Sequence, residues 1–289
     1  MASVIPLVGD APVRPPRHAD QVRTMREGTR PSRTFWWDRA RPADAAVDPL
    51  RAVIFNLDGA LADIERDGHR VAFNTAFAAH GLDVVWDVED YGRLLRIGDE
   101  QRRIAVDLRR RGFGKASGKL ATQIHRTKSA VLHDCLLDGD VAPRPGLIDS
   151  VMSLFVAGVW VGVVAKGRRA WAEPLVRQLV GDGIVETIVT SDDLAEPASE
   201  CDGYALALWE FGIDPESALA VEGSAAGLRA AAAVGLATVV VTTDYTARQD
   251  FTGAAAVRSA YDGADPLLAS SCERLHGRWW TTKKRSAAA

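Results

Sequence analysis

The stretch RAVIFNLDGALAD, residues 51–63, decides the fold expected for this chain. Its first half is a short apolar run, and it continues into Asn56-Leu57-Asp58-Gly59. An apolar run of this length without alternation predicts a strand over 51–56, in a parallel sheet that is covered on both faces. Gly59 has no side chain, so the backbone of the turn after the strand can come close to a bound ligand. The polar residues at the carboxyl end of this strand are therefore candidates for a site.

Four further apolar runs have the same character, and we expect them to form strands as well. They cover residues 159–164, 185–190, 218–222 and 237–242. Amphipathic or alanine-rich patterns alternate with these runs and predict helices over 147–157, 170–181, 203–212 and 224–234. Alternation of this kind is typical of an α/β protein with a doubly wound parallel sheet.

Residues 65–145 interrupt this alternation, because they contain several helical patterns and no convincing strand. The spacing of Val71, Phe73 and Phe77, for example, suits an amphipathic helix. A helical insertion after the first strand is expected to form a cap over the carboxyl ends of the strands. We therefore expect a leader over 1–49, a core made of 50–64 and 146–262, a cap over 65–145, and a C-terminal helix with a basic tail over 263–289.

Composition narrows the class of protein further. The chain has 289 residues, of which 47% are hydrophobic and 25% charged, with a net charge of −3. This balance gives no general attraction to nucleic acid or to an anionic membrane. Three scattered cysteines fit a reducing compartment rather than a disulfide framework or a zinc site. No run approaches the roughly 20 apolar residues that span a bilayer, and a signal peptide is not expected. We expect a cytoplasmic protein.

The two ends differ from the rest of the chain. Residues 1–49 contain seven of the 13 prolines and eight arginines, a composition that favours disorder. Within this leader, Phe35, Trp36 and Trp37 are flanked by arginines, and such residues anchor protein interfaces. We expect this segment to bind a protein partner or to pack on the chain's own core, with nucleic acid a weaker alternative. The same alternatives hold for the basic tail around Trp279.

With this arrangement of strands and insertion, the chain resembles the haloacid dehalogenase-like (HAD) superfamily, and within it the CbbY-type sugar-bisphosphate phosphatases. Members of the superfamily have Asp-x-Asp-Gly-Thr-Leu where this chain has Asn-Leu-Asp-Gly-Ala-Leu at 56–61. Three stretches, at 67–95, 144–159 and 241–257, are similar to the first half of the CbbY cap, the return to the core, and the end of the core. The resemblance extends over about residues 50–260 and implies a HAD core with a helical cap.

The resemblance also implies that the catalytic set is incomplete. In those phosphatases the first carboxylate of the motif attacks phosphorus, and here that position is Asn56, whereas Asp58 retains the acid/base position. A hydroxyl residue of the second motif corresponds to Ala165, and a lysine of the third motif corresponds to Ala198. In the fourth motif Glu222 is kept and the neighbouring acid is lost. No residue is therefore expected to be catalytically competent.

Binding residues follow from the same comparison. No metal is expected at the vestigial positions Asn56, Asp58 and Glu222, although Mg²⁺ would be required if the chain were a phosphatase. The candidate ligand-binding residues are Asp58, Gly59, Asp67, His69, Arg102, Lys166, Arg168 and Glu222. The charged residues among them could equally belong to solvated faces. The ligand would be a phosphorylated or otherwise anionic small molecule.

Three functional hypotheses remain. We favour a non-catalytic HAD-like protein that works through binding, as a regulator, sensor or assembly factor. The first alternative is a hydrolase of altered chemistry that uses Asp58, Glu222, Asp67 or His69. The second is a conventional sugar-phosphate phosphatase. Loss of the attacking carboxylate is the reason for the order, because an amide oxygen carries no anionic lone pair.

Overall fold

A six-stranded parallel sheet forms the centre of the molecule in the computed structural model, which describes residues 47–138, 141–195 and 198–288. The strand order is β3-β2-β1-β4-β5-β6. The strands are β1 (Ala52–Asn56), β2 (Trp160–Val164), β3 (Val185–Val189), β4 (Ala218–Glu222), β5 (Ala237–Val241) and β6 (Ala256–Arg258). The chain starts in the middle of the sheet, so the order reverses between β1 and β4. Ligands of such sheets bind at that point, beyond the carboxyl ends of the strands.

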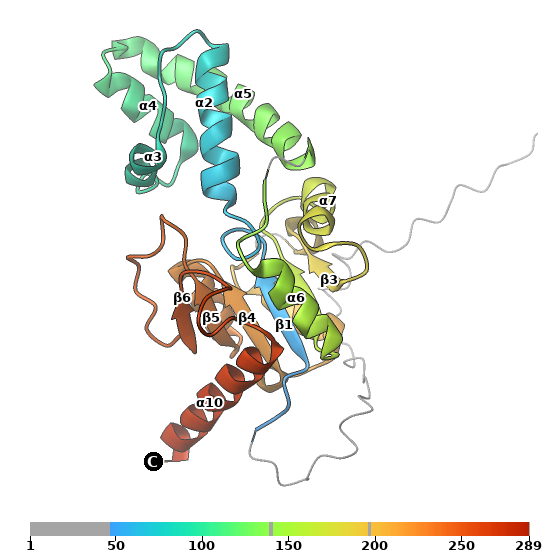
Figure 1. The fold of residues 1–289 in the computed structure, drawn as a ribbon. Coiled ribbons are helices and arrows are strands. Elements are labelled where there is room, and N and C mark those ends of the chain that lie inside the picture. The colour runs from blue at the N-terminus through green and yellow to red at the C-terminus, as the bar shows by residue number, and fades with distance from the viewer. Residues whose placement is uncertain (1–46, 139–140, 196–197, 289) are drawn as a thin grey trace, which may run out of the picture.

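Helices cover both faces of this sheet, as the alternating pattern predicted (Figure 1). On one face, α6 (Leu147–Val156), α7 (Arg169–Val180) and α10 (Ala269–Ala288) pack on residues such as Phe55 and Val163. On the other, α8 (Asp202–Phe211) and α9 (Ala225–Ala233) pack on Ile54 and Ala220. Because both faces are buried, the strands read as continuous apolar runs.

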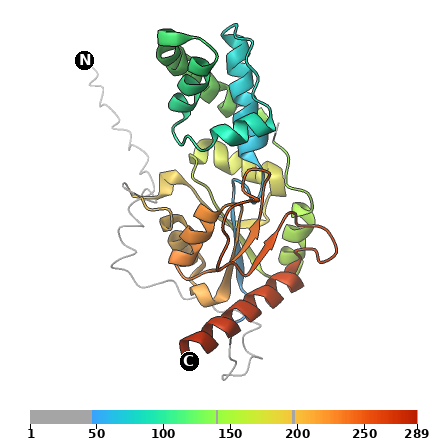
Figure 2. The same ribbon diagram turned by 90° about the vertical axis from the view of Figure 1, so that its left-hand side faces the viewer.

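The insertion after β1 forms a helical lobe, residues 64–138, which stands above the carboxyl ends of the strands (Figures 1 and 2). It consists of the π-helical turn η2 (Ile64–His69) followed by α2 (Arg70–Ala79), α3 (Val88–Leu94), α4 (Glu100–Arg110), the 3-10 turn η3 (Gly114–Ala116) and α5 (Ser117–Asp138). Its own apolar core contains Phe73, Phe77 and Trp86. The ring centroid of Trp86 lies 4.9 Å from that of Phe73 and 4.7 Å from that of Phe77. The predicted helical insertion is confirmed.

Shorter elements complete the core, and one of them was missed by the sequence patterns. The 3-10 turns are η4 (Ser191–Asp193) and η5 (Pro215–Ser217). The unexpected element is β6, a three-residue edge strand whose Val257 is half-exposed. A strand this short presents no apolar run, so it is recognised only through its pairing with β5.

The C-terminal tryptophans pack on the chain's own core, which was one of the three alternatives for the basic tail. Trp280 is buried, and its ring lies 4.9 Å from that of Trp279 in an edge-on arrangement. The indole nitrogen of Trp279 donates to the carbonyl of Gly253 at 3.1 Å. The leader residues Phe35, Trp36 and Trp37 lie outside the described residues. In the part of the chain that the structure describes, no helix is both long and apolar enough to cross a membrane.

Candidate functional site

The carboxyl ends of β1 and β4 meet at the point where the strand order reverses, and there Asn56 faces Glu222. The side-chain amide nitrogen of Asn56 donates to both carboxylate oxygens of Glu222, at 3.1 and 3.0 Å. The hydroxyl of Tyr204, on α8, donates to the same carboxylate, and the backbone N–H of Gly223 donates to it at 3.1 Å. The amide presents its nitrogen, which is its donor end, to the same two oxygens that accept from Tyr204 and Gly223.

Burial governs the charge of this group. Glu222 is 1% exposed, and burial raises the pKa of its carboxyl, while hydrogen bonds from Tyr204, Asn56 and Gly223 counteract part of that rise. The Tyr204 hydroxyl has a raised pKa for the same reason, burial first and the Glu222 carboxylate second. A buried carboxylate is stable only if hydrogen bonds replace its lost water. Asn56 and Tyr204 therefore belong to one fully engaged cluster with Glu222.

Two glycines bring the loops after β1 and β4 into contact. Gly59 has a φ of +85°, and a Cβ added to Gly223 would lie 2.7 Å from the Gly59 Cα. Only glycine fits at position 223 without moving the backbone. A third glycine, Gly227 in the first turns of α9, leaves room for the Glu222 carboxylate, since a Cβ there would lie 1.9 Å from its Oε2. The sequence alone gave no sign of either close approach.

Arg144 holds the loop that carries Asp58 and Gly59. Its guanidinium donates to the carbonyls of Gly59, Thr242 and Ser259, at 3.1, 2.7 and 3.1 Å. These three carbonyls belong to segments that are far apart in the sequence, so one side chain ties together the loops at the carboxyl edge of the sheet. The position of Asp58 is fixed as a consequence.

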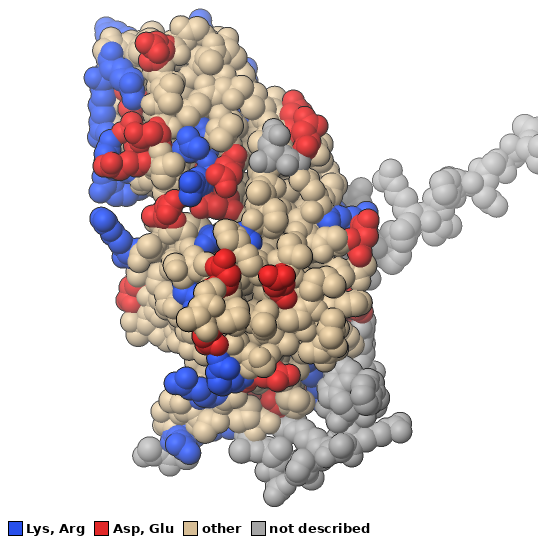
Figure 3. All heavy atoms as spheres, viewed as in Figure 1, with Lys and Arg blue, Asp and Glu red and all other residues tan. Residues whose placement is uncertain are grey.

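A cavity of about 490 Å³ lies between this edge of the core and the helical lobe. Its charged lining consists of the carboxylates Asp58, Asp63 and Glu65 and the cations Arg96 and Lys166. The cavity is therefore mixed in charge, and Figure 3 shows acidic and basic side chains close together along the junction between the lobe and the core. The rest of its lining is mainly hydroxyl, amide and glycine residues: Asn56, Gly59, Gly92, Leu95, Gly223, Ser224, Thr243, Tyr245, Thr246 and Gln249.

Two contacts hold the lobe over this cavity. Arg66 of η2 forms an ion pair with Asp244 of the core at 2.8 Å. Tyr245, from the same core loop, packs against Tyr91 with ring centroids 5.6 Å apart. A Cβ at Gly92 would lie 3.0 Å from the Tyr245 ring, so a glycine at position 92 permits the ring to lie against α3.

Asp58 is the titratable group of the cavity that stands out. Its side chain is open to solvent in the cavity, but protein surrounds it on the remaining sides. This burial, together with the nearby carboxylates of Glu65 and Asp63, raises its pKa to about 7, whereas His69 and the Ile64 N–H oppose the rise. The Ile64 N–H donates to Oδ1 at 3.2 Å. A carboxyl that titrates near neutrality can take or give a proton.

The positions that resemble the second and third motifs bring no hydroxyl or cation to Asn56. Ala165 is buried at the end of β2, and Ala198 is exposed in the loop before α8. Lys166 lines the cavity, but its side chain is 70% exposed and its ammonium pairs with Glu200 at 3.1 Å. Arg168 is 82% exposed beside Asp192 and lies outside the cavity lining. The solvated alternative holds for Arg168.

Within the lobe, His69 belongs to a cluster of charges centred on Glu100. The carboxylate of Glu100 contacts His69 Nδ1 at 3.0 Å, Lys128 Nζ at 2.7 Å and His125 Nε2 at 2.9 Å. Burial alone would raise the pKa of Glu100, but hydrogen bonds from His69 and Lys128 lower it on balance. Lys128 is 2% exposed, and burial lowers its pKa. Sequence reasoning missed Lys128, because its distance along the chain from His69 hid their contact.

Arg102 and Asp67 are placed differently from what the resemblance implied. Arg102 lies on the exposed face of α4, and its neighbour Arg103 is the one that points inward, donating to the carbonyl of Ile97 and the hydroxyl of Tyr91. Asp67 is half-exposed beside Arg66, outside the cavity lining. Helical geometry explains both, since successive residues of a helix face different sides.

Comparison with known proteins shows to which family a chain of this architecture belongs. The model of the haloacid dehalogenase-like hydrolases matches residues 50–235. The chain belongs to this family. Within it, the chain is CbbY-like. Protein CbbY of Cereibacter sphaeroides is 37% identical over 208 residues, covering 71% of this chain and 90% of that protein, and a CBBY-like protein of Arabidopsis thaliana is 34% identical over 216 residues, covering 71% and 67%.

Solved structures of the same group agree. The crystal structure of CbbY from Rhodobacter sphaeroides in complex with phosphate superimposes with a TM-score of 0.56 at 34% identity, over 73% of this chain and 94% of that one. An Asp-to-Asn mutant of the same protein, in complex with xylulose-(1,5)bisphosphate, gives a TM-score of 0.57 with the same identity and coverage. The predicted HAD-type fold and the CbbY-like resemblance are confirmed.

The residues at the carboxyl edge do not suit Mg²⁺, the ion that HAD-type phosphatases use. Mg²⁺ requires a near-octahedral set of oxygen ligands. Here the Asn56 amide presents its N–H groups, not its oxygen, to Glu222, and the carboxylate already accepts from three groups. Among the described residues, no three His, Cys, Asp or Glu side chains are grouped as a metal site.

Proposed function

We propose that this CbbY-like chain is a non-catalytic member of the HAD-like hydrolase family and that it acts by binding. The observation that carries the proposal is the pair of hydrogen bonds from the Asn56 amide to both oxygens of Glu222. These bonds use both Glu222 oxygens, which would otherwise be available to hold a metal ion. Asn56 also offers no carboxylate to attack phosphorus, so formation of an aspartyl phosphate has no starting group.

The cavity supports a binding role for the site. Carboxylates of Asp63 and Glu65 can accept from the hydroxyls of a sugar, and Arg96 and Lys166 can contact an anionic group. The crystallised Asp-to-Asn mutant of the Rhodobacter sphaeroides CbbY holds xylulose-(1,5)bisphosphate, so a CbbY protein can bind a sugar bisphosphate with one aspartate replaced by asparagine. We therefore propose a sugar phosphate, bound without hydrolysis, as the ligand class.

Thermal unfolding with a panel of sugar phosphates, in the absence of metal, tests the binding. A ligand that binds the folded state raises the melting temperature. We expect such a rise for the full chain and its loss in Lys166→Ala. Arg168→Ala is the matched control, because Arg168 is also a cation after β2 but lies outside the cavity. The proposed ligand class would be contradicted if no sugar phosphate raised the melting temperature of the natural chain, or if Lys166→Ala and Arg168→Ala lost the rise equally.

A second function is favoured by one observation, the raised pKa of Asp58 in the cavity. A carboxyl with a pKa of about 7 can serve as general acid or base at neutral pH. The alternative is thus a hydrolase of altered chemistry in which Asp58 moves the proton. It predicts turnover of a sugar phosphate that Asp58→Asn abolishes, whereas the non-catalytic proposal predicts none to abolish. Mg²⁺ would enter only if the second function held.

A further inference from the structure

Helix α6 is apolar on two sides, and only one of them is covered by the described residues. Leu147, Val151 and Leu154 are buried against the sheet. The solvent-facing side carries, beside the exposed Asp149, four of the eight exposed large hydrophobic side chains of the described chain: Ile148, Met152, Phe155 and Val156. A surface helix normally presents a polar outer face, so an apolar stripe that runs along the solvent side of a helix is expected to be covered. Figure 3 shows a mostly uncharged surface over α6.

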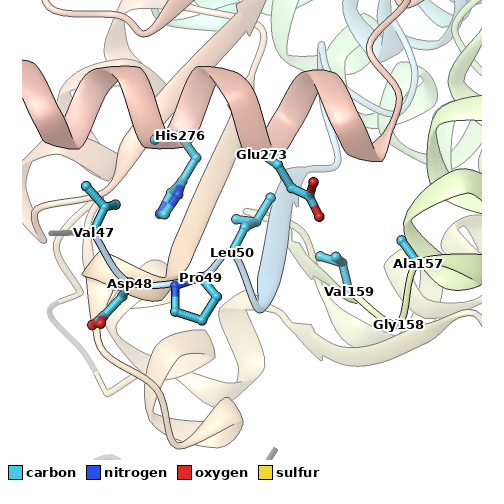
Figure 4. Close-up of a pocket in the computed structure, with 10 residues that line it drawn as sticks. Val47, Asp48, Pro49, Leu50, Ala157, Gly158, Val159, Glu273 and His276 are labelled. Carbon is cyan, nitrogen blue, oxygen red and sulfur yellow. The ribbon is translucent and has the colours of Figure 1, made fainter. Parts of the chain in front are cut away.

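This apolar stripe leads directly into a second cavity, of about 470 Å³, at the amino ends of β1 and β2. Its buried lining includes Leu50, Val159 and His276 of α10, whereas Ala157 and Glu273 of α10 are exposed at its edge (Figure 4). It lies at the opposite edge of the sheet from Asn56, so it is separate from the site described above. The stripe adjoins the apolar part of the cavity, around Leu50 and Val159, because Val156 is followed by the lining residue Ala157. We call the stripe and this part of the cavity the α6 groove.

The described chain begins at this surface. Val47, the first described residue, is itself part of the cavity lining. The run Phe35-Trp36-Trp37 ends ten residues before Val47. Ten extended residues reach about 35 Å, and α6 is about 15 Å long, so the run can lie anywhere on the groove. Its tether also holds it at high effective concentration beside the groove.

Chemistry fits as well as reach. Three adjacent aromatic side chains can cover the exposed apolar side chains of the groove, because aromatic residues bury a large area per residue. Arginines 33 and 39 flank the run, and the exposed carboxylate of Glu273 lies at the rim of the cavity. We propose that the Phe35–Trp37 segment of this same chain docks in the α6 groove.

Limited trypsin digestion of the full chain tests this proposal with an internal reference. The segment is bracketed by cleavable bonds after Arg33 and Arg39, and the leader offers further cleavable bonds after Arg17 and Arg23. If the segment is docked, it must open locally before trypsin can cleave it. We expect cleavage after Arg33 and Arg39 to be about tenfold slower than after the two distal arginines. Equal rates at all four bonds would overturn the proposal.

Variants locate the docking surface. Phe155→Asp with Val156→Asp should bring the protected bonds to the distal rate, because a carboxylate in the groove opposes burial of an aromatic ring. Val85→Asp is the control, since Val85 is also a well-exposed valine but lies on the lobe, at 65% against 81% for Val156. Trp36→Ala with Trp37→Ala should also abolish protection, without touching the folded core. Protection that survives either double variant would contradict the assignment.

Dilution decides between this chain and a second copy as the occupant. Intramolecular docking gives protection that is independent of protein concentration, whereas docking into a second copy weakens on dilution. We expect the cleavage rate after Arg33 and Arg39, divided by the rate after Arg17 and Arg23, to stay constant over an approximately hundredfold dilution of the protein. A ratio that approaches one on dilution would show a dimer and overturn the proposal.

Discussion

Replacing Asn56 by aspartate should place two carboxylates about 3 Å apart, because the Asn56 amide nitrogen lies 3.0 and 3.1 Å from the Glu222 oxygens. The change removes donors to a charged group, worth about 1.5–3 kcal/mol. It also adds like-charge repulsion, which reaches about 5 kcal/mol at an effective dielectric constant of 20. The pair will keep one proton to avoid most of this repulsion. We therefore expect a net destabilisation of about 3 kcal/mol at pH 8.

The measurement is urea unfolding of the full chain and of Asn56→Asp between pH 5 and pH 8. The loss of stability should shrink as the pH falls, because the folded pair must take up a proton that the unfolded chain releases, and this uptake costs less free energy at lower pH. Asn56→Ala is the control, since it loses the donors without adding a charge and should vary less with pH. Millimolar Mg²⁺ should stabilise Asn56→Asp and leave the natural chain unchanged. If Asn56→Asp equals or exceeds the natural chain in stability at pH 8 without metal, the account of this cluster is wrong.

Three further changes probe the same region. Tyr204→Phe removes a buried donor to Glu222, so the free energy of unfolding measured in urea should fall by about 1.5–3 kcal/mol. Gly227→Ala should lower the melting temperature although alanine favours helices by about 1 kcal/mol, because its methyl would meet the Glu222 carboxylate. Gly277→Ala, in α10 with nothing within 4 Å, should not. For Asp58→Asn, calorimetry should give a stability relative to the natural chain that rises between about pH 4 and pH 7 and is flat below. In the folded chain Asp58 keeps its proton up to about pH 7, whereas in the unfolded chain it loses the proton near pH 4. Rising pH between these values therefore favours unfolding of the natural chain and not of Asp58→Asn.

Much of the fold could be predicted from the sequence because a parallel sheet leaves a strong local signal. Five of the strands were expected within one or two residues of their observed ends, since buried strands are continuous apolar runs. The helical insertion was visible from spacings such as Phe73 and Phe77. Strand β6 was not, because three residues at an edge carry too little pattern and depend on pairing with β5.

The site was predictable in its residue types but not in its contacts. Asn56 and Glu222 could be named from their motif positions, yet their hydrogen bonds depend on two strands brought together by the topology. The roles of Tyr204 and Gly227 follow from packing against Glu222 and had no local signature. Arg102 was assigned to the cavity because a loop alignment gives position along the chain and not the face of a helix.

Release of phosphate from xylulose-(1,5)bisphosphate, with millimolar Mg²⁺ and the purified full chain, tests the central claim most directly. Without an attacking carboxylate at position 56, and with the Asn56 amide bound to Glu222, we expect no release above the rate of a protein-free control. The matched protein control is Asn56→Ala, which should give the same background. Release that saturates with substrate and disappears in Asn56→Ala would contradict the account.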